Sequence, residues 1–168
     1  MAKQKVYSPL AQMSLEQVHI QRVLKSLAIH SKIPIEDVRN VSQDPNYFED
    51  DIDCFIGDSS YEIKLDFYKS GFCFLETISN NKTGALGWLL ISKADWLVYA
   101  FPDENVFYLA SMRVVREWLL DNVPHLKDNR RNVKNQSEDN STYMTFGYVV
   151  SRDGLEELGI FKRFVLHK

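Results

Sequence analysis

The sequence predicts an α/β protein in a single domain, with a mixed central β-sheet of about five strands flanked by helices. Three observations support this class. Apolar residues recur with a helical period near the start of the chain and again at 112–122, and apolar and polar residues alternate with a strand period at 51–67. A chain of 168 residues that is 45% apolar and 12% aromatic has the size and composition of one globular domain, covering residues 1–168.

The first helix is predicted from a capping signal and an apolar stripe. Ser14 followed by Gln17 forms a capping box, and the helix is expected to continue to about residue 31. The apolar stripe consists of Leu15, Val18, Ile20, Val23, Leu24 and Leu27. A further helical turn is expected at 33–38, before a polar stretch at 40–46.

Residues 51–67 predict a β-hairpin whose two faces differ. One face is nearly all apolar and should be the core side: Ile52, Cys54, Ile56, Tyr61, Ile63 and Leu65. The chain turns at 57–60, either through two residues or through all four, and both turns give the same register. In this register Asp53 faces Lys64, and Glu62 shares their side of the sheet.

The charged face of the hairpin is crowded. Asp51 and Asp66 are predicted to face each other beside Asp53, Glu62 and Lys64, so four carboxylates surround one ammonium group. Like charges directly opposite in a sheet are destabilising, so a further positive partner is expected there. Two interpretations stay open: a metal-binding site, or a plain amphipathic hairpin with its polar face in water.

Further strands are predicted at 72–79, 96–101, 106–110 and 143–150, because these runs are rich in apolar and β-branched residues and are bounded by turn signals. The type of the apolar element at 84–91 stays open. Glu76 interrupts the first of these strands. It is either a further metal ligand or water-orienting group beside the acidic patch, or a residue at a sheet edge that faces solvent.

Two later helices are expected, at 112–122 with Ser111 as the cap and at 151–158 with Ser151 as the cap. Between them, residues 126–142 form a polar segment that is long for a loop within a compact domain, which is typical of a functional, mobile or disordered loop. Its basic residues include Arg130, Arg131 and Lys134. The segment is either an arm that contacts phosphates or a solvated linker.

An acidic residue on one strand followed by Glu-x-Lys on the next, here Asp53 and then Glu62-Ile63-Lys64, resembles the PD-(D/E)XK nucleases. The matching part is short, and Ile52 stands where the family often has proline. The resemblance implies a restriction-endonuclease-like fold with an αβββαβ core. It also implies hydrolysis of DNA phosphodiesters, with Mg²⁺ or Mn²⁺ as the cofactor.

The resemblance assigns roles to these residues. It implies that Asp53, Glu62 and the backbone carbonyl of Ile63 bind the metal, with Glu76 as a possible additional ligand. Lys64 would position the attacking water or neutralise charge that develops on the phosphate. Carboxylate and carbonyl oxygens suit Mg²⁺ or Mn²⁺, which lowers the pKa of a bound water. Arg130, Arg131 and Lys134 would be the nucleic-acid contacts.

The sequence therefore predicts a metal-dependent DNA endonuclease, with DNA as its partner and a homodimer left open. One alternative is a non-catalytic module that binds nucleic acid or protein on the same fold, with its acids as surface charge. Another is a small regulatory interaction protein, with exposed aromatic residues and the segment 161–164 as its contacts. The net charge of −3 argues against coating nucleic acid by bulk electrostatics but leaves a local patch possible.

Location in the cell is predicted from the cysteines and from the absence of targeting segments. Cys54 and Cys73 lie in predicted strands and are expected to be buried free thiols of a reducing compartment. The first residues lack an apolar core of signal-peptide length, and no apolar stretch is long enough to span a membrane. A cytoplasmic protein without a membrane span is expected.

Overall fold

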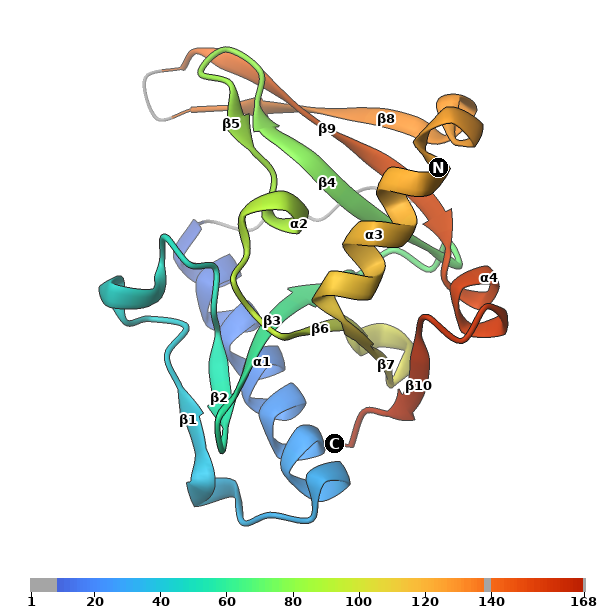
Figure 1. Ribbon diagram of the computed structural model, residues 1–168. Helices are drawn as coiled ribbons and strands as arrows, with labels where there is room; N and C mark the ends of the chain where they lie inside the picture. Colours follow the sequence, from blue (N-terminus) through green and yellow to red (C-terminus); the bar gives the residue numbers. More distant parts are fainter. Residues whose placement is uncertain (1–8, 138–139, 168) are drawn as a thin grey trace.

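The computed structural model describes residues 9–137 and 140–167, with side chains from residue 15 onward. Two β-sheets pack together with helices, as Figure 1 shows. The predicted α/β class is confirmed. The prediction of one central sheet of about five strands was wrong, because one sheet has six strands and a second sheet has four.

The six-stranded sheet carries the predicted hairpin. Its strands lie in the order β1 (Val38–Asn40), β2 (Cys54–Ile56), β3 (Ser59–Leu65), β6 (Trp96–Phe101), β7 (Val106–Ser111) and β10 (Lys162–Val165). Neighbouring strands are antiparallel except β3 and β6, which are parallel. A parallel pair needs a crossover connection. Here the chain between β3 and β6 forms two strands of the second sheet and a short helix before it returns.

The four-stranded sheet is antiparallel throughout, with strands in the order β5 (Ala85–Leu86), β4 (Phe72–Asn80), β9 (Thr142–Ser151) and β8 (Arg130–Gln136). Strand β8 corrects the prediction of a loop at 126–142. Six of its seven residues are exposed, because it is an edge strand that extends beyond the core. Its polar sequence therefore reflects solvent on both of its faces. Positions 138–139 of the predicted loop lie outside the described residues.

The α-helices are α1 (Pro9–Ser31), α2 (Trp88–Ile91), α3 (Met112–Asn122) and α4 (Arg152–Glu157). Short 3-10 turns lie at η1 (Ile35–Asp37), η2 (Pro45–Tyr47), η3 (Pro102–Glu104), η4 (Val123–His125) and η5 (Lys127–Asn129). The open segment at 84–91 thus contains β5 and α2.

The structure tests the three predicted caps. Helix α1 begins at Pro9, so Ser14 lies inside it and is not its cap. Ser111 stands at the N-cap position of α3, but its side chain makes no capping hydrogen bond. The prediction for Ser151 is confirmed, because its hydroxyl accepts a hydrogen bond from the Gly154 N–H at 3.1 Å.

Each face of the six-stranded sheet is covered. Val98, Ala100 and Phe107 pack with the apolar stripe of α1, whereas Leu97, Tyr99 and Tyr108 pack with α3 and the four-stranded sheet. This division follows from the strand period, which sends successive side chains to opposite faces. Cys54 and Cys73 are free and buried, one in each core, as expected. The second sheet therefore covers the side of β3 that carries Glu62 and Lys64.

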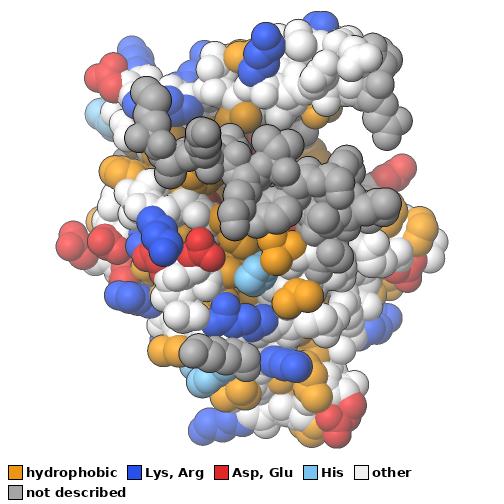
Figure 2. Space-filling view, turned by 180° about the vertical axis from the view of Figure 1, so that it is seen from behind, with side chains coloured by type: hydrophobic (Ala, Val, Ile, Leu, Met, Phe, Trp, Pro, Cys, Tyr) orange, Lys and Arg blue, Asp and Glu red, His pale blue; other side chains and the backbone are white. Residues whose placement is uncertain are grey.

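Helix α1 is tied to the sheet by a polar anchor at its centre. The Arg22 guanidinium donates hydrogen bonds to the backbone oxygens of Pro102, Leu166 and His167. Figure 2 shows the side of the molecule on which α1 lies, where side chains of both charges are interspersed with hydrophobic ones. No helix among the described residues is long and apolar enough to cross a membrane.

Candidate active site

The hairpin of β2 and β3 forms, but its register differs from the prediction. Cys54 pairs with Tyr61 and Ile56 with Ser59, so the turn consists of Gly57 and Asp58. Gly57 has φ 57°, the positive value that a two-residue hairpin turn requires at its first central position. Every residue of β2 therefore faces a residue two positions earlier on β3 than predicted. Because a shift of two keeps each side chain on its face, the predicted grouping of charged residues survives.

The shift changes which charged residues are neighbours. Beyond the last pair, Cys54 with Tyr61, the Asp53 carboxyl interacts by hydrogen bonding with that of Glu62, where Lys64 was predicted to face it. The predicted pairing of Asp51 with Asp66 is wrong. Asp51 lies outside the strand with φ 52°, and Asp66 accepts hydrogen bonds from the Tyr68 N–H and the Tyr99 hydroxyl.

The charged face of the hairpin is not in water. Glu62 is 2% exposed, and the side chain of its ion-pair partner Lys64 is 28% exposed. The two residues point away from α1 toward the second sheet, since Tyr61 and Ile63 between them belong to the core under α1. A plain amphipathic hairpin with a solvated polar face is therefore ruled out for Glu62.

Backbone groups of β3 complete the site. The Ile63 N–H donates a hydrogen bond to Asp53 Oδ2 at 2.7 Å, and the Asp53 N–H donates to the Tyr61 carbonyl at 2.8 Å. In a strand, the N–H and C=O of one residue point to the same edge. The Ile63 carbonyl thus points to the edge on which Asp53 lies, beyond the last residue pair with β2.

Burial and mutual repulsion change the acidity of the carboxylates. Burial, with contributions from Asp53 and Asp51, raises the pKa of Glu62 to about 8 even though Lys64 acts in the opposite direction. Burial also raises the pKa of Asp53. Burial alone would lower the pKa of Lys64, but Glu62 and the other acids raise it instead. At neutral pH the cluster therefore holds a proton between its acids and keeps its lysine charged.

We expect this proton to make the metal-free protein less stable as the pH rises. Between pH 4.5 and 8 the folded protein keeps a proton on Glu62 that the unfolded chain has lost, so rising pH favours unfolding. In EDTA, we expect the melting temperature of Glu62→Gln minus that of wild type to rise between pH 5 and pH 8.5. The rise should be on the order of 5–10 °C. A pH-independent difference between the two proteins would contradict the raised pKa.

Glu76 joins this cluster from the second sheet. Burial raises its pKa, while Lys64 and the Trp88 N–H oppose that shift, so its carboxyl lies within the electrostatic reach of Lys64. The chain passes close to it at Gly87, where an added Cβ would lie 2.6 Å from the Glu76 carbonyl carbon. Of the two options predicted for Glu76, the structure places it beside the acidic patch.

Trp88 covers the Lys64 side of the charged cluster. It is buried, and its ring centroid lies 5.2 Å from Lys64 Nζ, within the range of a cation–π contact. Sequence reasoning missed Trp88 and Gly87 because the type of the segment 84–91 was not predicted. The only signal was an apolar run after a glycine, which does not reveal what it covers.

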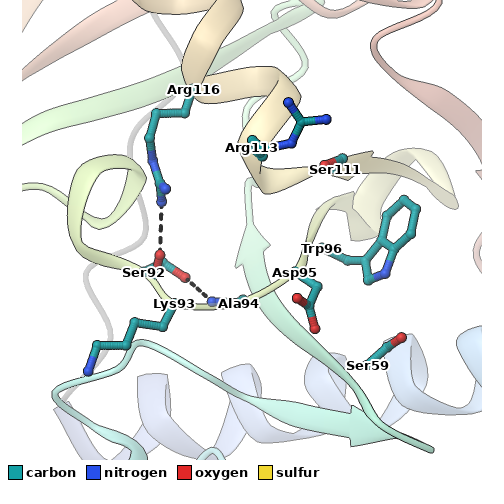
Figure 3. Close-up of a pocket in the computed structure, with 9 residues that line it drawn as sticks. All are labelled: Ser59, Ser92, Lys93, Ala94, Asp95, Trp96, Ser111, Arg113 and Arg116. Carbon is teal, nitrogen blue, oxygen red and sulfur yellow. Dashed lines mark hydrogen bonds between the residues drawn. The ribbon is translucent and has the colours of Figure 1, made fainter.

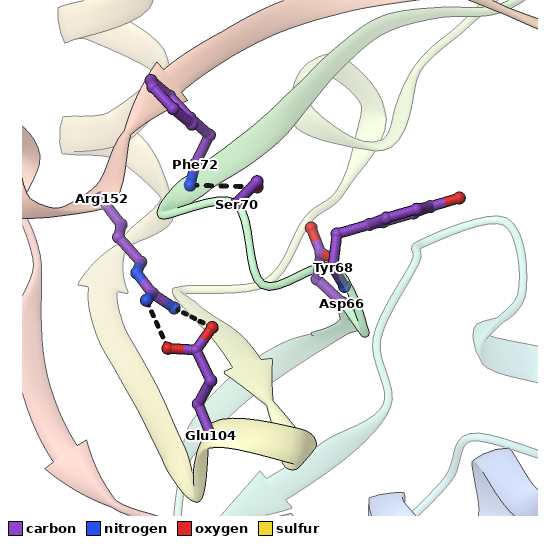
Figure 4. Close-up of polar contacts among 6 residues, drawn as sticks. All are labelled: Asp66, Tyr68, Ser70, Phe72, Glu104 and Arg152. Carbon is purple, nitrogen blue, oxygen red and sulfur yellow. Dashed lines mark hydrogen bonds and ion pairs between the residues drawn. The ribbon is translucent and has the colours of Figure 1, made fainter. Parts of the chain in front are cut away.

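The position of the second sheet beside β3 is fixed by hydrogen bonds. The Phe74 N–H donates to the Tyr99 hydroxyl at 2.9 Å, and this hydroxyl donates to Asp66 Oδ2 at 3.2 Å. Tyr99 is the register partner of Lys64 across the parallel pair, so the edge of β4 is held next to the site. Figure 4 shows Asp66 at the end of β3 and, nearby, the ion pair of Arg152 with Glu104.

A pocket of about 520 Å³ lies at the opposite end of β3 and β6 (Figure 3), and the charged cluster does not line it. Its cations are engaged: Arg116 donates to the carbonyls of Leu89 and Ser92, Arg113 pairs with Glu117, and Lys93 pairs with Asp50. The Ser92 hydroxyl also donates to the Asp51 carbonyl at 3.1 Å. The contacts of Ser92 and Lys93, which line the pocket, therefore hold the loop that precedes Asp53 in place.

The predicted metal site contains fewer side chains than a preformed cage. Within the described part of the chain, no three histidine, cysteine or acidic side chains are grouped to hold a metal ion. The donor set fits a hard cation nonetheless: Asp53 and Glu62 supply carboxylates and Ile63 a carbonyl oxygen, and Mg²⁺ is usually bound by one or two carboxylates plus water and phosphate oxygens. A bound metal would also neutralise the two adjacent acids, the buried Glu62 and the partly exposed Asp53, which share the cation Lys64.

The predicted nucleic-acid contacts lie on β8, away from the charged cluster. Arg130 and Lys134 point to one face of the four-stranded sheet and Arg131 to the other, because their register partners Tyr148, Met144 and Gly147 alternate along β9. The segment 161–164, which one alternative took as a partner contact, is exposed only in part: Lys162 and Arg163 are exposed on the edge strand β10. Phe161 is 2% exposed, and β10 follows it in the six-stranded sheet.

Comparison of the chain with family models, curated proteins and solved structures finds no match in any of the three.

Proposed function

We propose that this protein is a metal-dependent DNA endonuclease of the PD-(D/E)XK type, which hydrolyses phosphodiester bonds. The observation that carries the proposal is the grouping of Asp53, Glu62 and Lys64 beside β3, where Glu62 is buried and pairs with the partly exposed Lys64 and Asp53 accepts from the Ile63 N–H. Two adjacent acids cost stability here, since burial raises their pKa values. Such a cluster is typical of a functional site.

The order of elements supports the proposal. Helix α1 is followed by the antiparallel strands β1, β2 and β3, by a crossover that contains α2, and by β6 parallel to β3. This order agrees with the αβββαβ core that the resemblance to PD-(D/E)XK nucleases implies. The four-stranded sheet is then an elaboration built from the crossover and from the hairpin of β8 and β9.

Each residue of the cluster has a distinct role in this proposal. Asp53, Glu62 and the Ile63 carbonyl would hold Mg²⁺ or Mn²⁺, which when bound supplies a polarised phosphoryl oxygen and a water of lowered pKa. Glu76, within electrostatic reach of Lys64, would accept a hydrogen bond from a water molecule. Lys64 remains protonated among the acids and stabilises negative charge on the phosphate.

The test is cleavage with matched metal conditions. Supercoiled plasmid, single-stranded circles and branched DNA should be cut with Mg²⁺ or Mn²⁺ and remain intact in EDTA, and Glu62→Ala should reduce cutting at least a hundredfold. Circular dichroism of both proteins controls for folding. The proposal fails if purified wild type cuts none of these substrates with either metal. Binding without cutting would favour the alternative of a non-catalytic module on the same fold.

A further inference from the structure

The outer face of the four-stranded sheet combines aromatic, small and basic residues in register. On β4, burial alternates: Cys73 and Leu75 are buried in the core, whereas Phe72, Phe74 and Glu76 point to the other face. Their partners on β9 are Ser151, Val149 and Gly147. Arg131 on β8 pairs with Gly147 and so shares this face. We define the outer face by Phe72, Phe74, Gly147, Val149, Ser151 and Arg131.

The outer face is continuous with the candidate active site. Glu76 follows Phe74 and Phe72 along one side of β4, and Glu76 is also the residue of this strand that interacts with Lys64. The hydrogen bond from the Phe74 N–H to Tyr99 fixes this strand next to β3. A chain lying along β4 on this face would therefore lead from the aromatic rings to Glu76, whose carboxyl lies within electrostatic reach of Lys64.

The shape of the outer face favours a thin, flexible ligand. The middle strand contributes small residues opposite the aromatic ones, Ser151 opposite Phe72 and Gly147 opposite Glu76. At Gly147 an added Cβ would lie 2.5 Å from the Leu75 carbonyl oxygen and 2.6 Å from the Phe74 ring, so no larger residue fits there. The Phe74 ring therefore lies over Gly147 on β9, with Phe72 beside it on β4 and the exposed Arg131, which donates to the Asp128 and Arg130 carbonyls, on β8.

We infer that this outer face binds unpaired nucleotides and leads a single-stranded segment of the substrate to the site. The inference rests on the proposed nuclease function and specifies its substrate class. Aromatic side chains stack on any exposed base, and a positive charge beside them attracts the phosphates. Phe72 and Phe74 are alternate residues of a strand and lie about 7 Å apart. That is about twice the 3.4 Å rise per nucleotide in a duplex strand. The spacing therefore suits an extended strand whose bases are not stacked on one another.

The geometry distinguishes this ligand from a duplex. Bases within a duplex present only their edges, so rings on a flat sheet cannot stack on them. Phe72 is 42% exposed and is therefore available for such a contact. Arg131 faces the same side as the rings, whereas Lys134, three positions along β8, faces the opposite side of the sheet. The two residues thus form a matched pair for experiment, with equal charge on one strand but on different faces.

The experiment measures binding without cleavage. Fluorescently labelled oligothymidine and oligouridine single strands, and a duplex of the same length, are titrated with full-length protein in EDTA. Wild type should bind the single strands more tightly than the duplex. Phe72→Ala should lose about tenfold in affinity for the single strands, because one base loses its stacking partner, and Phe72→Tyr should restore it. Phe48→Ala is the control, since Phe48 is 57% exposed but lies outside the outer face.

The matched residues Arg131 and Lys134 provide a second test. Arg131→Ala should weaken single-strand binding and reduce the salt slope of the binding constant by about 0.7, the value for one lost phosphate contact, whereas Lys134→Ala should change neither. The inference is overturned if the duplex binds as tightly as the single strands. It is equally overturned if Phe72→Ala and Arg131→Ala bind like wild type, or if Lys134→Ala loses as much as Arg131→Ala.

The outcomes separate this inference from the proposed function. A protein that cuts DNA while Phe72→Ala and Arg131→Ala bind single strands like wild type is a nuclease without this binding face. A protein that binds single strands through Phe72 and Arg131 but never cuts with Mg²⁺ or Mn²⁺ retains the binding face and loses the proposed catalysis. Equal affinity for oligothymidine and oligouridine would assign the recognition to base rings and phosphates alone, and a preference for one would assign part of it to the 2′-hydroxyl or to the 5-methyl group of thymine.

Discussion

Replacing Lys64 by Met should reduce metal-dependent DNA cleavage by at least about a hundredfold while metal binding stays intact. Lys64 is the cation of the buried cluster, paired with Glu62 and covered by Trp88. Removing a charge directed at the transition state typically costs two to three orders of magnitude. Met keeps most of the apolar length of lysine, so the loss would arise from charge and not from packing. Single-turnover cleavage at saturating metal measures the effect.

The Lys64 experiment has a matched control in Lys93. The Lys93 side chain is 69% exposed and pairs with Asp50, so Lys93→Met removes the same charge from the loop beside the site but not from the cluster. We expect Lys93→Met to cleave within about twofold of wild type, since exposed ion pairs contribute little. Cleavage by Lys64→Met at the wild-type rate would remove Lys64 from the proposed mechanism.

Adding Mg²⁺ or Mn²⁺ should raise the melting temperature of wild type and leave that of Asp53→Ala or Glu62→Ala nearly unchanged. A ligand at a hundred times its Kd stabilises the folded state by about 2.7 kcal/mol. For a chain of this size that is a rise of roughly 5–10 °C. In EDTA, Asp53→Ala should melt at or above the wild-type temperature, because it removes one of two crowded acids whose pKa values are raised by burial.

Asp58→Asn serves as the control for the metal experiment, because Asp58 lies in the same hairpin but is exposed in the turn. It should keep the full wild-type response to the metal. An equal rise in wild type, Asp53→Ala and Glu62→Ala would place any bound metal elsewhere on the protein.

Periodicity was sufficient to predict most elements but not the register of the hairpin. The strands at 96–101 and 106–111 and the helix at 112–122 carry strong apolar patterns and form as expected. The hairpin closes at Gly57 and Asp58. A shift of two residues leaves the apolar pattern unchanged, so the alternation could not decide between the registers. In the structure, the positive φ of Gly57 marks it as the first central residue of the turn. The sequence shows that a glycine is present but not which position of the turn it occupies.

The second sheet could not be predicted because its pairings are distant in sequence. Strand β4 was expected as a strand, but its partner β9 follows some seventy positions later, as the pairing of Cys73 with Val150 shows. Strand β8 has no apolar alternation, since both of its faces are exposed. The same omission left the two interpretations of the charged face open. An amphipathic hairpin predicts a polar face in water, and only the unexpected sheet places that face in the interior.

The second sheet is built from two separate segments of the chain, the crossover between β3 and β6 and the hairpin of β8 and β9, and this has a consequence for folding. Strands β6 and β7 are joined by the short turn η3, so their pairing closes a small loop and can form early. The pairing of β4 with β9 must instead close a loop across almost half of the chain. The chain loses the conformational entropy of that loop before the first contact between the strands forms. The strands β2, β3, β6 and β7 of the six-stranded sheet are therefore expected to pair first, with Glu62 and Lys64 still hydrated. These residues lose water only when β4 and β9 meet, which makes the assembly of the charged cluster one of the last events in folding.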